Sequence, residues 1–165
     1  MFKLSKLADY SIVIMTHMVQ EGEHSVHTAK ALADKTKLPL PTVGKILKAL
    51  SRGGMLVSHR GSHGGYSVLC LPKEVSIANI IRAIDGEIAL TECSSSAPGL
   101  CELEHVCPVR SNWRIINQTV IAALQKLSIA DMTLPLPKSI MHIGQKRRSH
   151  SLKIANSSPV PEEIL

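Results

Sequence analysis

Apolar side chains recur every three or four positions along residues 5–20, and this spacing predicts an amphipathic helix. The apolar stripe of this helix consists of Leu7, Tyr10, Ile14 and Met18. A second, shorter helix is predicted over residues 29–35, because Thr28 is a residue type that caps helix N-termini. The run Glu21-Gly22-Glu23 separates the two. The chain is therefore expected to begin with two helices and a short connection.

A third helix is predicted after Pro39, with Pro41 in its first turn, where proline is tolerated. Its apolar residues follow the i, i+3, i+4, i+7 pattern of a buried face, which consists of Val43, Ile46, Leu47 and Leu50. The pair Gly53-Gly54 ends this helix. Two short helices with a tight connection, the second of them basic on its outer face, form the pattern of a helix-turn-helix.

Residues 55–60 and 66–71 are predicted to be two strands, and the glycine-rich residues 61–65 between them predict a hairpin. Such a hairpin beside a helix-turn-helix is a wing. After it, Ser76 is suited to cap a fourth helix that ends at Gly86. The apolar face of that helix consists of Ile77, Ile80, Ile81 and Ile84.

From Pro108 onward, the apolar positions follow the three-and-four spacing of a helical seam. The seam consists of Trp113, Ile116, Val120, Ala123, Leu127 and Ala130. It predicts one helix of about 24 residues, or about 36 Å. A helix this long on so small a chain favours pairing with a second copy, and the alternative is an ordinary amphipathic core helix. A second apolar line, Ile121 and Leu124, is expected to face the body of its own subunit.

These elements predict a mostly α fold with a small β wing (α+β), namely a winged helix-turn-helix followed by a long C-terminal dimerisation helix. Residues 1–73 form the expected DNA-binding domain. Residues 74–134 hold the linking helix, a short strand or extended run at 88–92, a cysteine loop and the dimerisation helix. Residues 135–165 are expected to be a basic, disordered tail, because they lack apolar periodicity.

The net charge of +6 is distributed unevenly. Residues 1–73 contribute +6, residues 74–137 contribute −3 and residues 138–165 contribute +3. The basic part coincides with the predicted helix-turn-helix, which fits a phosphate partner, and a solubilising surface is the alternative. Aromatic residues make up only 2% of the chain, so stacking on single-stranded bases is not expected. Reading the grooves of double-stranded DNA needs no aromatic residues.

No apolar run reaches the roughly 18 to 20 residues that span a bilayer, so no membrane partner is expected. The apolar N-terminus carries Asp9 ahead of its apolar run and lacks a small-residue cleavage site, so we interpret it as a folded helix and not as a signal peptide. The chain is therefore expected in the cytoplasm, where stable disulfides are uncommon.

Three cysteines, Cys93, Cys101 and Cys107, fall within fifteen residues. Thiols grouped this closely can form disulfides, bind a metal or react with an oxidant. Three soft thiolates suit an iron–sulfur cluster. The alternatives are a thiol redox switch and structural zinc with His105 as the fourth ligand, although its spacing from Cys107 is awkward for chelation. Cys70 is interpreted as a buried small hydrophobic residue.

The outer face of the third predicted helix supplies candidate DNA contacts. Thr42 and Lys45, near its N-terminal end, are best placed to reach base edges. Lys48 and Arg52 are better placed for phosphates, which position a protein without specifying a sequence. Further candidates for the phosphate backbone are Ser5, Lys6, Arg60 and His63. An ordinary solvated helix face is the alternative for the lysines.

Four features in this order resemble the IscR/NsrR/RirA family of winged-helix iron–sulfur transcription regulators. They are L-S-K-L-A-D-Y at 4–10, L-P-L-P-T-V-G-K-I-L-K-A-L at 38–50, R-G-S-H-G-G-Y-S-V at 60–68, and the three cysteines. Within that family the chain is most similar to the regulators of the SUF iron–sulfur assembly system. The residues that carry this closer resemblance are I-A-L-T-E-C at 88–93, C-E-L-E at 101–104 and R-S-N-W at 110–113.

The resemblance implies a homodimeric repressor that binds a double-stranded DNA operator and holds an iron–sulfur cluster (2Fe-2S or 4Fe-4S). It also implies control of iron–sulfur assembly genes in response to the state of the cluster. The alternatives are a regulator of other genes that senses nitric oxide, redox state or iron availability, and, outside this class, a small thiol-redox or metal-transfer protein. An enzyme is not expected, because no C-x-x-C motif, nucleophile–base arrangement or phosphate-binding glycine loop occurs in the chain.

Several members of the family hold their cluster with three cysteines and a histidine three residues after the last of them. Arg110 occupies that position here, and a guanidinium does not normally ligate iron. The resemblance to the nitric-oxide-sensing branch implies that Asp9 of the partner subunit is the fourth ligand. His105 and Glu104 are the local alternatives.

Overall fold

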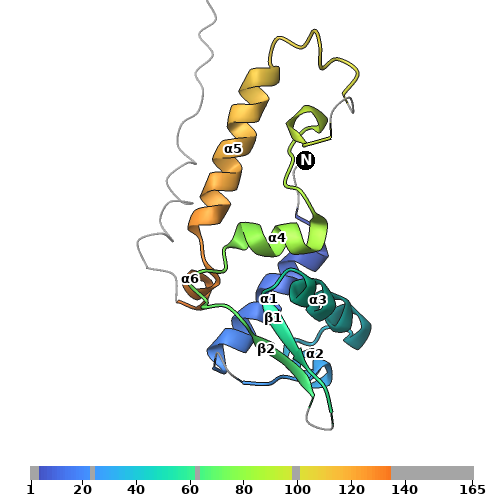
Figure 1. Ribbon diagram of the computed structural model, residues 1–165, viewed down its shortest axis with the longest axis vertical. Coiled ribbons are helices and arrows are strands. Elements are labelled where there is room, and N and C mark those ends of the chain that lie inside the picture. Colours follow the sequence, from blue (N-terminus) through green and yellow to red (C-terminus); the bar gives the residue numbers. More distant parts are fainter. Residues whose placement is uncertain (1–3, 23–24, 62–63, 98–100, 135–165) are drawn as a thin grey trace, which may run out of the picture. The chain divides into compact units, whose positions relative to one another are not determined.

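The computed structural model describes residues 4–22, 25–61, 64–97 and 101–134 (Figure 1). Within these residues the elements in chain order are α1 (Lys6–Gln20), α2 (Ala29–Thr36), α3 (Leu40–Arg52), β1 (Leu56–His59), β2 (Gly65–Val68), α4 (Ile77–Asp85), the 3₁₀ turn η1 (Glu92–Ser94), α5 (Arg110–Lys126) and α6 (Ile129–Thr133). The predicted mostly α fold with a small antiparallel wing is confirmed. His63 and the tail at 135–165 lie outside the described residues.

Side-chain caps determine where the first helices begin. Ser5 Oγ accepts a hydrogen bond from Ala8 N (3.0 Å), and Thr28 Oγ1 accepts one from Ala31 N (3.1 Å). These oxygens satisfy N–H groups that the first turn of a helix leaves without a partner. Lys37 has a left-handed backbone (φ 58°), which turns the chain sharply from α2 into α3. The cap predicted at Thr28 is therefore confirmed.

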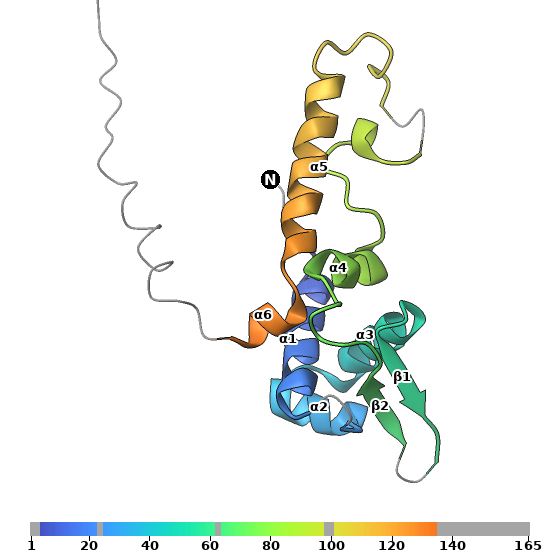
Figure 2. The same ribbon diagram turned by 60° about the vertical axis from the view of Figure 1, so that its left-hand side comes forward.

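One face of α3 lies at the centre of the core. Its side chains are at most 1% exposed, and they are the predicted Val43, Ile46, Leu47 and Leu50. Helices α1 and α4 pack against α3 (Figures 1 and 2). Burying an aliphatic side chain this completely contributes roughly 1.5–3 kcal/mol. These four positions therefore fix how α3 is rotated about its own axis, and its polar side chains face outward.

The wing is attached near its loop end to the chain between α1 and α2. His27 N donates to Tyr66 O (2.8 Å), and Tyr66 N donates to His27 O (2.9 Å), which adds a rung beside β2. A Cβ at Gly65 would lie 2.5 Å from the His27 carbonyl oxygen, so this close approach requires glycine. Burial lowers the pKa of the His27 imidazole, which favours the neutral ring.

Each strand of the wing is shorter than predicted and has four residues. The second strand ends at Val68, before Pro72, which lacks a backbone N–H for a sheet. The following helix α4 agrees with the prediction. Ser76 caps it through a capping box with Asn79, and Gly86 ends it with a left-handed φ of 88°.

The long C-terminal helix is broken, which corrects the prediction of a single helix of about 24 residues. α5 stops after 17 residues, and α6 follows it. Between them Leu127 is extended, and Ser128 caps α6. Two backbone hydrogen bonds to the residues around the start of α4 replace helical ones here: Ile77 N donates to Leu127 O (2.9 Å), and Ile129 N donates to Val75 O (2.8 Å).

The apolar residues of α5 lie on two sides. Ile121 and Leu124 pack against the core of the same chain, as predicted. Among the residues predicted as a seam, Trp113 is 38% exposed and Ile116 is 44% exposed, and Leu127 just after the helix is 48% exposed. Within the described ranges this second apolar side is thus largely uncovered.

Residues 88–91 are irregular and Glu92 begins η1, so the predicted short strand at 88–92 is not observed. In the part of the chain that the structure describes, no helix combines the length and apolar character that crossing a bilayer requires.

Candidate nucleic-acid interface and cysteine segment

Three cations and one hydroxyl line the outer face of α3. Lys45, Lys48 and Arg52 are exposed, and Thr42 is half-buried. Their spacing of three or four residues places them on one side of the helix, opposite the buried stripe. None of the three cationic side chains forms an ion pair or hydrogen bond with another residue in the described ranges. The face is therefore available to an anionic partner.

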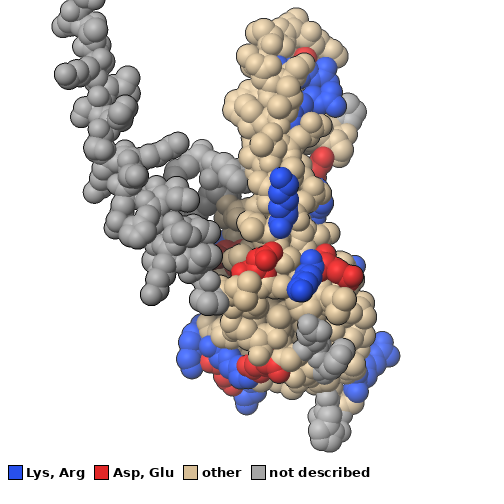
Figure 3. All heavy atoms as spheres, turned by 90° about the vertical axis from the view of Figure 1, so that its left-hand side faces the viewer, with Lys and Arg blue, Asp and Glu red and all other residues tan. Residues whose placement is uncertain are grey.

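A hollow lies between α3 and the wing, lined by Lys48, Ser51, Arg52, Ser58 and Tyr66. Two cations and three hydroxyls form a donor set that suits phosphate oxygens. The sequence did not identify Ser58 and Tyr66, because strand alternation does not tell which side of a two-stranded wing turns toward a helix. Arg60 is exposed just after β1. Figure 3 shows Lys and Arg side chains around the part that holds the helix-turn-helix and also along α5.

The two candidate contacts at the start of α1 differ from each other. Lys6 is exposed. Ser5 is half-buried, and its hydroxyl donates to Asp85 Oδ1 (2.7 Å) while it caps α1. Ser5 therefore ties the beginning of α1 to the end of α4, and a contact with a phosphate would compete with that bond.

The three clustered cysteines are free thiols, and each is half-buried. Cys93 lies in η1, and its sulfur is 3.3 Å from Thr91 Oγ1. The donor chemistry of three free thiols fits an iron–sulfur cluster. Their arrangement does not bring them together, because no group of three His, Cys, Asp or Glu side chains among the described residues is placed to hold a metal ion. Residues 98–100, which join Cys93 to Cys101, lie outside the described ranges.

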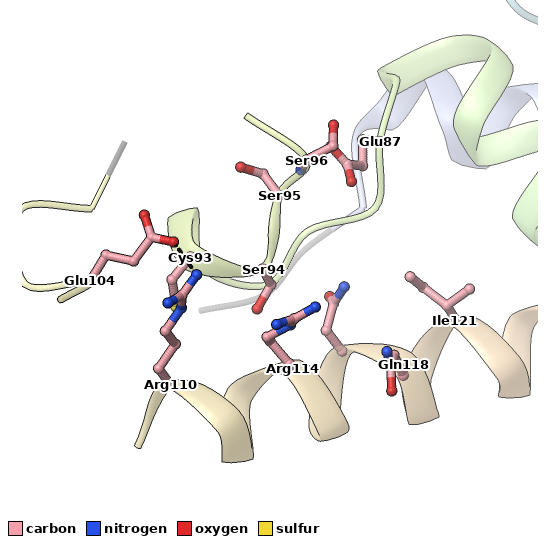
Figure 4. Close-up of a pocket in the computed structure, with 11 residues that line it drawn as sticks. Glu87, Cys93, Ser94, Ser95, Ser96, Glu104, Arg110, Arg114, Gln118 and Ile121 are labelled. Carbon is pink, nitrogen blue, oxygen red and sulfur yellow. Dashed lines mark hydrogen bonds and ion pairs between the residues drawn. The ribbon is translucent and has the colours of Figure 1, made fainter. Parts of the chain in front are cut away.

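Arg110 holds the turn between the last two cysteines against α5. Its guanidinium forms an ion pair with Glu104, whose side chain is only 12% exposed (Figure 4). Arg110 Nε is buried and has no hydrogen-bond partner among the described residues. The sequence identified Arg110 only as the residue in place of a histidine. Its opposite charge to Glu104 was the available signal for this contact.

Asn117 attaches the run after α4 to α5. It is the buried residue of α5, with 5% of its surface exposed. Asn117 Nδ2 donates to Ile88 O (3.1 Å), and Asn117 Oδ1 accepts from Leu90 N (3.0 Å). The sequence analysis missed this residue. Its place one turn before Ile121, on the side that faces the core, was the signal that could have found it.

A cavity of about 500 Å³ lies between η1 and α5 (Figure 4). Cys93 and the three serines that follow it line one side, and Arg110, Arg114, Asn117 and Gln118 line the other. Glu87 also borders the cavity, and its carboxylate accepts from Ser96 N (2.8 Å) and Ser96 Oγ (2.7 Å). These hydrogen bonds lower the pKa of Glu87, the backbone bond being the larger cause.

The remaining candidate ligands lie apart from one another. Asp9 is exposed in the first turn of α1, and His105 is exposed between the last two cysteines. Neither belongs to a group of potential metal ligands among the described residues. Cys70 is half-buried and not fully buried as predicted, and its thiol donates to Gly54 O (3.4 Å). It lies just beyond β2, where its sulfur packs beside the core.

Comparison with known proteins identifies similar chains. A family model described as Rrf2, iron-dependent transcriptional regulator, matches residues 4–134. The HTH-type transcriptional repressor NsrR of Streptomyces coelicolor is 25% identical over 132 residues, which cover 79% of this chain and 87% of that protein. The HTH-type transcriptional regulator NsrR of Bacillus subtilis is 22% identical over 133 residues, which cover 79% of this chain and 89% of the relative.

Solved structures share the fold. CymR, the global cysteine regulator of B. subtilis, has a TM-score of 0.63 at 23% identity, with 81% of this chain and 97% of CymR covered. T. potens IscR has a TM-score of 0.61 at 21% identity, with 79% of this chain and 85% of that chain covered. At these identities the likeness concerns the fold, which agrees with the winged helix-turn-helix described above.

The pairing of Glu87 with Ser96 predicts a pH-dependent order in the chain around Cys93. Because the pKa of Glu87 is lowered in the folded chain, the pairing stabilises the loop above the ordinary carboxyl pKa and is lost as the pH falls through the lowered value. We expect the Ser96 amide proton to shift upfield in that acidic range when followed by NMR. In Glu87→Gln the same proton should show no such titration, and an unchanged titration in this variant would contradict the assignment.

Proposed function

This chain belongs to the Rrf2 family of winged-helix transcription regulators, and we propose that it represses genes for iron–sulfur cluster assembly in response to the state of a cluster that it binds. Its class is that of a transcription regulator and not of an enzyme. The observation that carries the proposal is the direct connection of a winged helix-turn-helix to a segment with three free thiols. The resemblance of residues 88–113 to the SUF-system regulators supports the choice of target genes.

The DNA reader is α3. A recognition helix commonly enters the major groove with its N-terminal residues at the base edges, and Thr42 and Lys45 occupy that end. Lys48 and Arg52 lie further along the helix, where the hollow beside the wing offers hydroxyl groups as well. These two residues would contact the phosphate backbone, as would Lys6, Arg60 and His63. Ser5 would do so only after its hydrogen bond to Asp85 is broken. Residues 1–73 thus form the proposed DNA-binding domain.

The cofactor is an iron–sulfur cluster held by Cys93, Cys101 and Cys107. Thiolates are the ligands that such clusters prefer, and none of the three is consumed by a disulfide. When bound, the cluster supplies redox- and ligand-sensitive iron. This chain's residues give the segment two attachments to α5, the ion pair of Arg110 with Glu104 and the bonds of Asn117 to the run after α4. Zinc held by the same thiols is the alternative that experiment must exclude.

The active form is a homodimer that pairs through α5, within the proposed region at 74–134. The argument is the uncovered apolar side of this helix, since Trp113 is 38% exposed and Ile116 is 44% exposed. Apolar side chains gathered on one helix are typical of a surface that a partner covers. A second copy offers the same face, so the contact is self-complementary. Two copies would present two α3 helices to a pseudo-palindromic operator.

A second candidate function is sensing of nitric oxide or iron availability with other target genes. The observation that favours it is Asp9, which is exposed in the first turn of α1 and lies at the ligand position of the nitric-oxide-sensing branch. In that reading the DNA contacts and the thiol ligands stay the same.

The first test concerns sequence-specific DNA binding. Thr42→Ala and Lys45→Ala should each weaken binding to the operator by about 1–3 kcal/mol, because each removes a contact to a base edge. Arg52→Ala should weaken binding to operator and random DNA about equally, since phosphates carry no sequence. Fluorescence anisotropy at fixed salt measures all three. Equal losses on both DNAs for Lys45→Ala would show that the reading face is elsewhere.

The second test concerns the cofactor. Protein purified without oxygen should be brown, and Cys93→Ala, Cys101→Ala and Cys107→Ala should each remove the visible absorbance, because each removes a thiolate ligand. Cys70→Ala is the matched control and should keep the colour, since Cys70 lies beside the wing. A colourless protein that contains one zinc per chain would overturn the proposed cofactor.

The third test concerns the fourth ligand. We propose that Asp9 of the partner subunit completes the cluster, because a carboxylate can ligate iron whereas Arg110 cannot. Asp9→Ala should then accelerate cluster loss in air and change the absorbance spectrum, while folding and dimerisation persist. An unchanged spectrum in Asp9→Ala together with a changed one in His105→Ala would instead place the ligand within the same chain.

A further inference from the structure

Asn117 forms a pair of hydrogen bonds that no other side chain of its size can form. Its carboxamide donates to one backbone group and accepts from another, and those groups, Ile88 O and Leu90 N, are two residues apart. The pairing therefore resembles that of a neighbouring strand. An aspartate at this position would accept from Leu90 N but could not donate to Ile88 O. A leucine would leave both backbone groups without a partner in a buried place.

Cys93 follows three residues after this pairing. Thr91 Oγ1 lies 3.3 Å from Cys93 Sγ and 2.7 Å from Ser94 Oγ. On the far side of Cys93, Ser96 is bonded to Glu87, which precedes Ile88. The residues around Cys93 thus form a loop closed by the pairing of Glu87 with Ser96, and Asn117 attaches the start of that loop to α5. Figure 4 shows Cys93 beside Arg110, which also belongs to α5.

α5 has a second attachment at its other end. Ile77 N donates to Leu127 O, and Ile129 N donates to Val75 O, so the residues on both sides of the break are fixed to the start of α4. Helix α4 lies in the sequence between the two attachments, and it packs against α3. A displacement of residues 88–93 therefore reaches α5 through Asn117 and reaches α4 through the backbone.

We propose that Asn117 is a positioning residue that sets the place of the Cys93 thiol against α5 and couples movement of the cysteine segment to that helix. The inference gives the proposed cluster function a route from the thiols to the dimer helix, and in that sense it rests on the proposed function. The hydrogen bonds of Asn117, however, are present in the metal-free chain, so the inference can be tested on the apo protein.

The decisive experiment measures the reactivity of the Cys93 thiol in the full-length apo chain. Cys70→Ser, Cys101→Ser and Cys107→Ser leave Cys93 as the only thiol, and its modification by 5,5′-dithiobis(2-nitrobenzoate) is followed under native conditions. Adding Asn117→Asp should raise the rate by about tenfold, because the loop opens more often. Gln118→Asp is the control for the added carboxylate, since this neighbour lines the same cavity and is exposed, and it should not raise the rate. Equal rates in Asn117→Asp and the parent would overturn the proposal.

A measurement on the unmutated apo chain keeps the inference testable if Asn117→Asp fails to fold. The Leu90 amide donates to Asn117, whereas the neighbouring Ala89 amide has no hydrogen bond among the described residues. Hydrogen exchange followed by NMR should therefore show a protected Leu90 amide beside an unprotected Ala89 amide. Equal exchange at the two positions would contradict the contact.

The final arm separates this inference from the proposed function. Full-length protein with all four cysteines is reconstituted anaerobically with iron and sulfide, and visible circular dichroism reports the surroundings of the cluster. Asn117→Asp should change the spectrum and lower the retained iron, whereas Gln118→Asp should retain as much iron as the unmutated protein. If the unmutated protein takes up no iron, the proposed function fails, while the thiol rates still decide whether Asn117 positions Cys93.

Discussion

Burial of one side of α3 is the constraint on which the arrangement of the chain depends. Four aliphatic side chains of this helix have almost no exposed surface, and α1 and α4 pack around them. Because the buried side is fixed, the opposite side with Lys45, Lys48 and Arg52 must face the solvent. The same packing holds α4 in place, and α4 leads directly to the residues before Cys93. The DNA-facing surface and the start of the cysteine segment are therefore set by one core.

The parts of the fold that the sequence predicts well are those decided by neighbours in the chain. Helical periodicity located α1, α3 and α4, and short-range caps at Thr28 and Ser76 located where helices begin. The break between α5 and α6 escaped prediction, since the heptad-like spacing continues through it. That break depends on Ile77 and Leu127, which lie about fifty residues apart in the chain. No local pattern contains the information that these two backbones pair.

In the candidate site, too, some residues could be predicted from the sequence and others only from the fold. Residue chemistry was enough to single out three thiols and a basic helix face, because thiolates and cations have few equivalents among the side chains. It was not enough to find Asn117, whose importance comes from one backbone carbonyl and one backbone amide that lie far away in the sequence. Arg110 is an intermediate case. Its charge was noticed, but only the fold shows that its partner is Glu104 and that their pairing ties the turn to α5.

The rung between His27 and Tyr66 has a mechanical consequence for DNA recognition. It joins β2, near the hairpin loop, to the short connection between α1 and α2, so the wing is supported there as well as through β1, which follows α3. A force applied to this end of the wing is therefore carried into the α1–α2 connection through the rung as well as along β1. The recognition helix then receives only part of that load. The contact between the wing and a duplex can change while the orientation of α3 stays nearly the same.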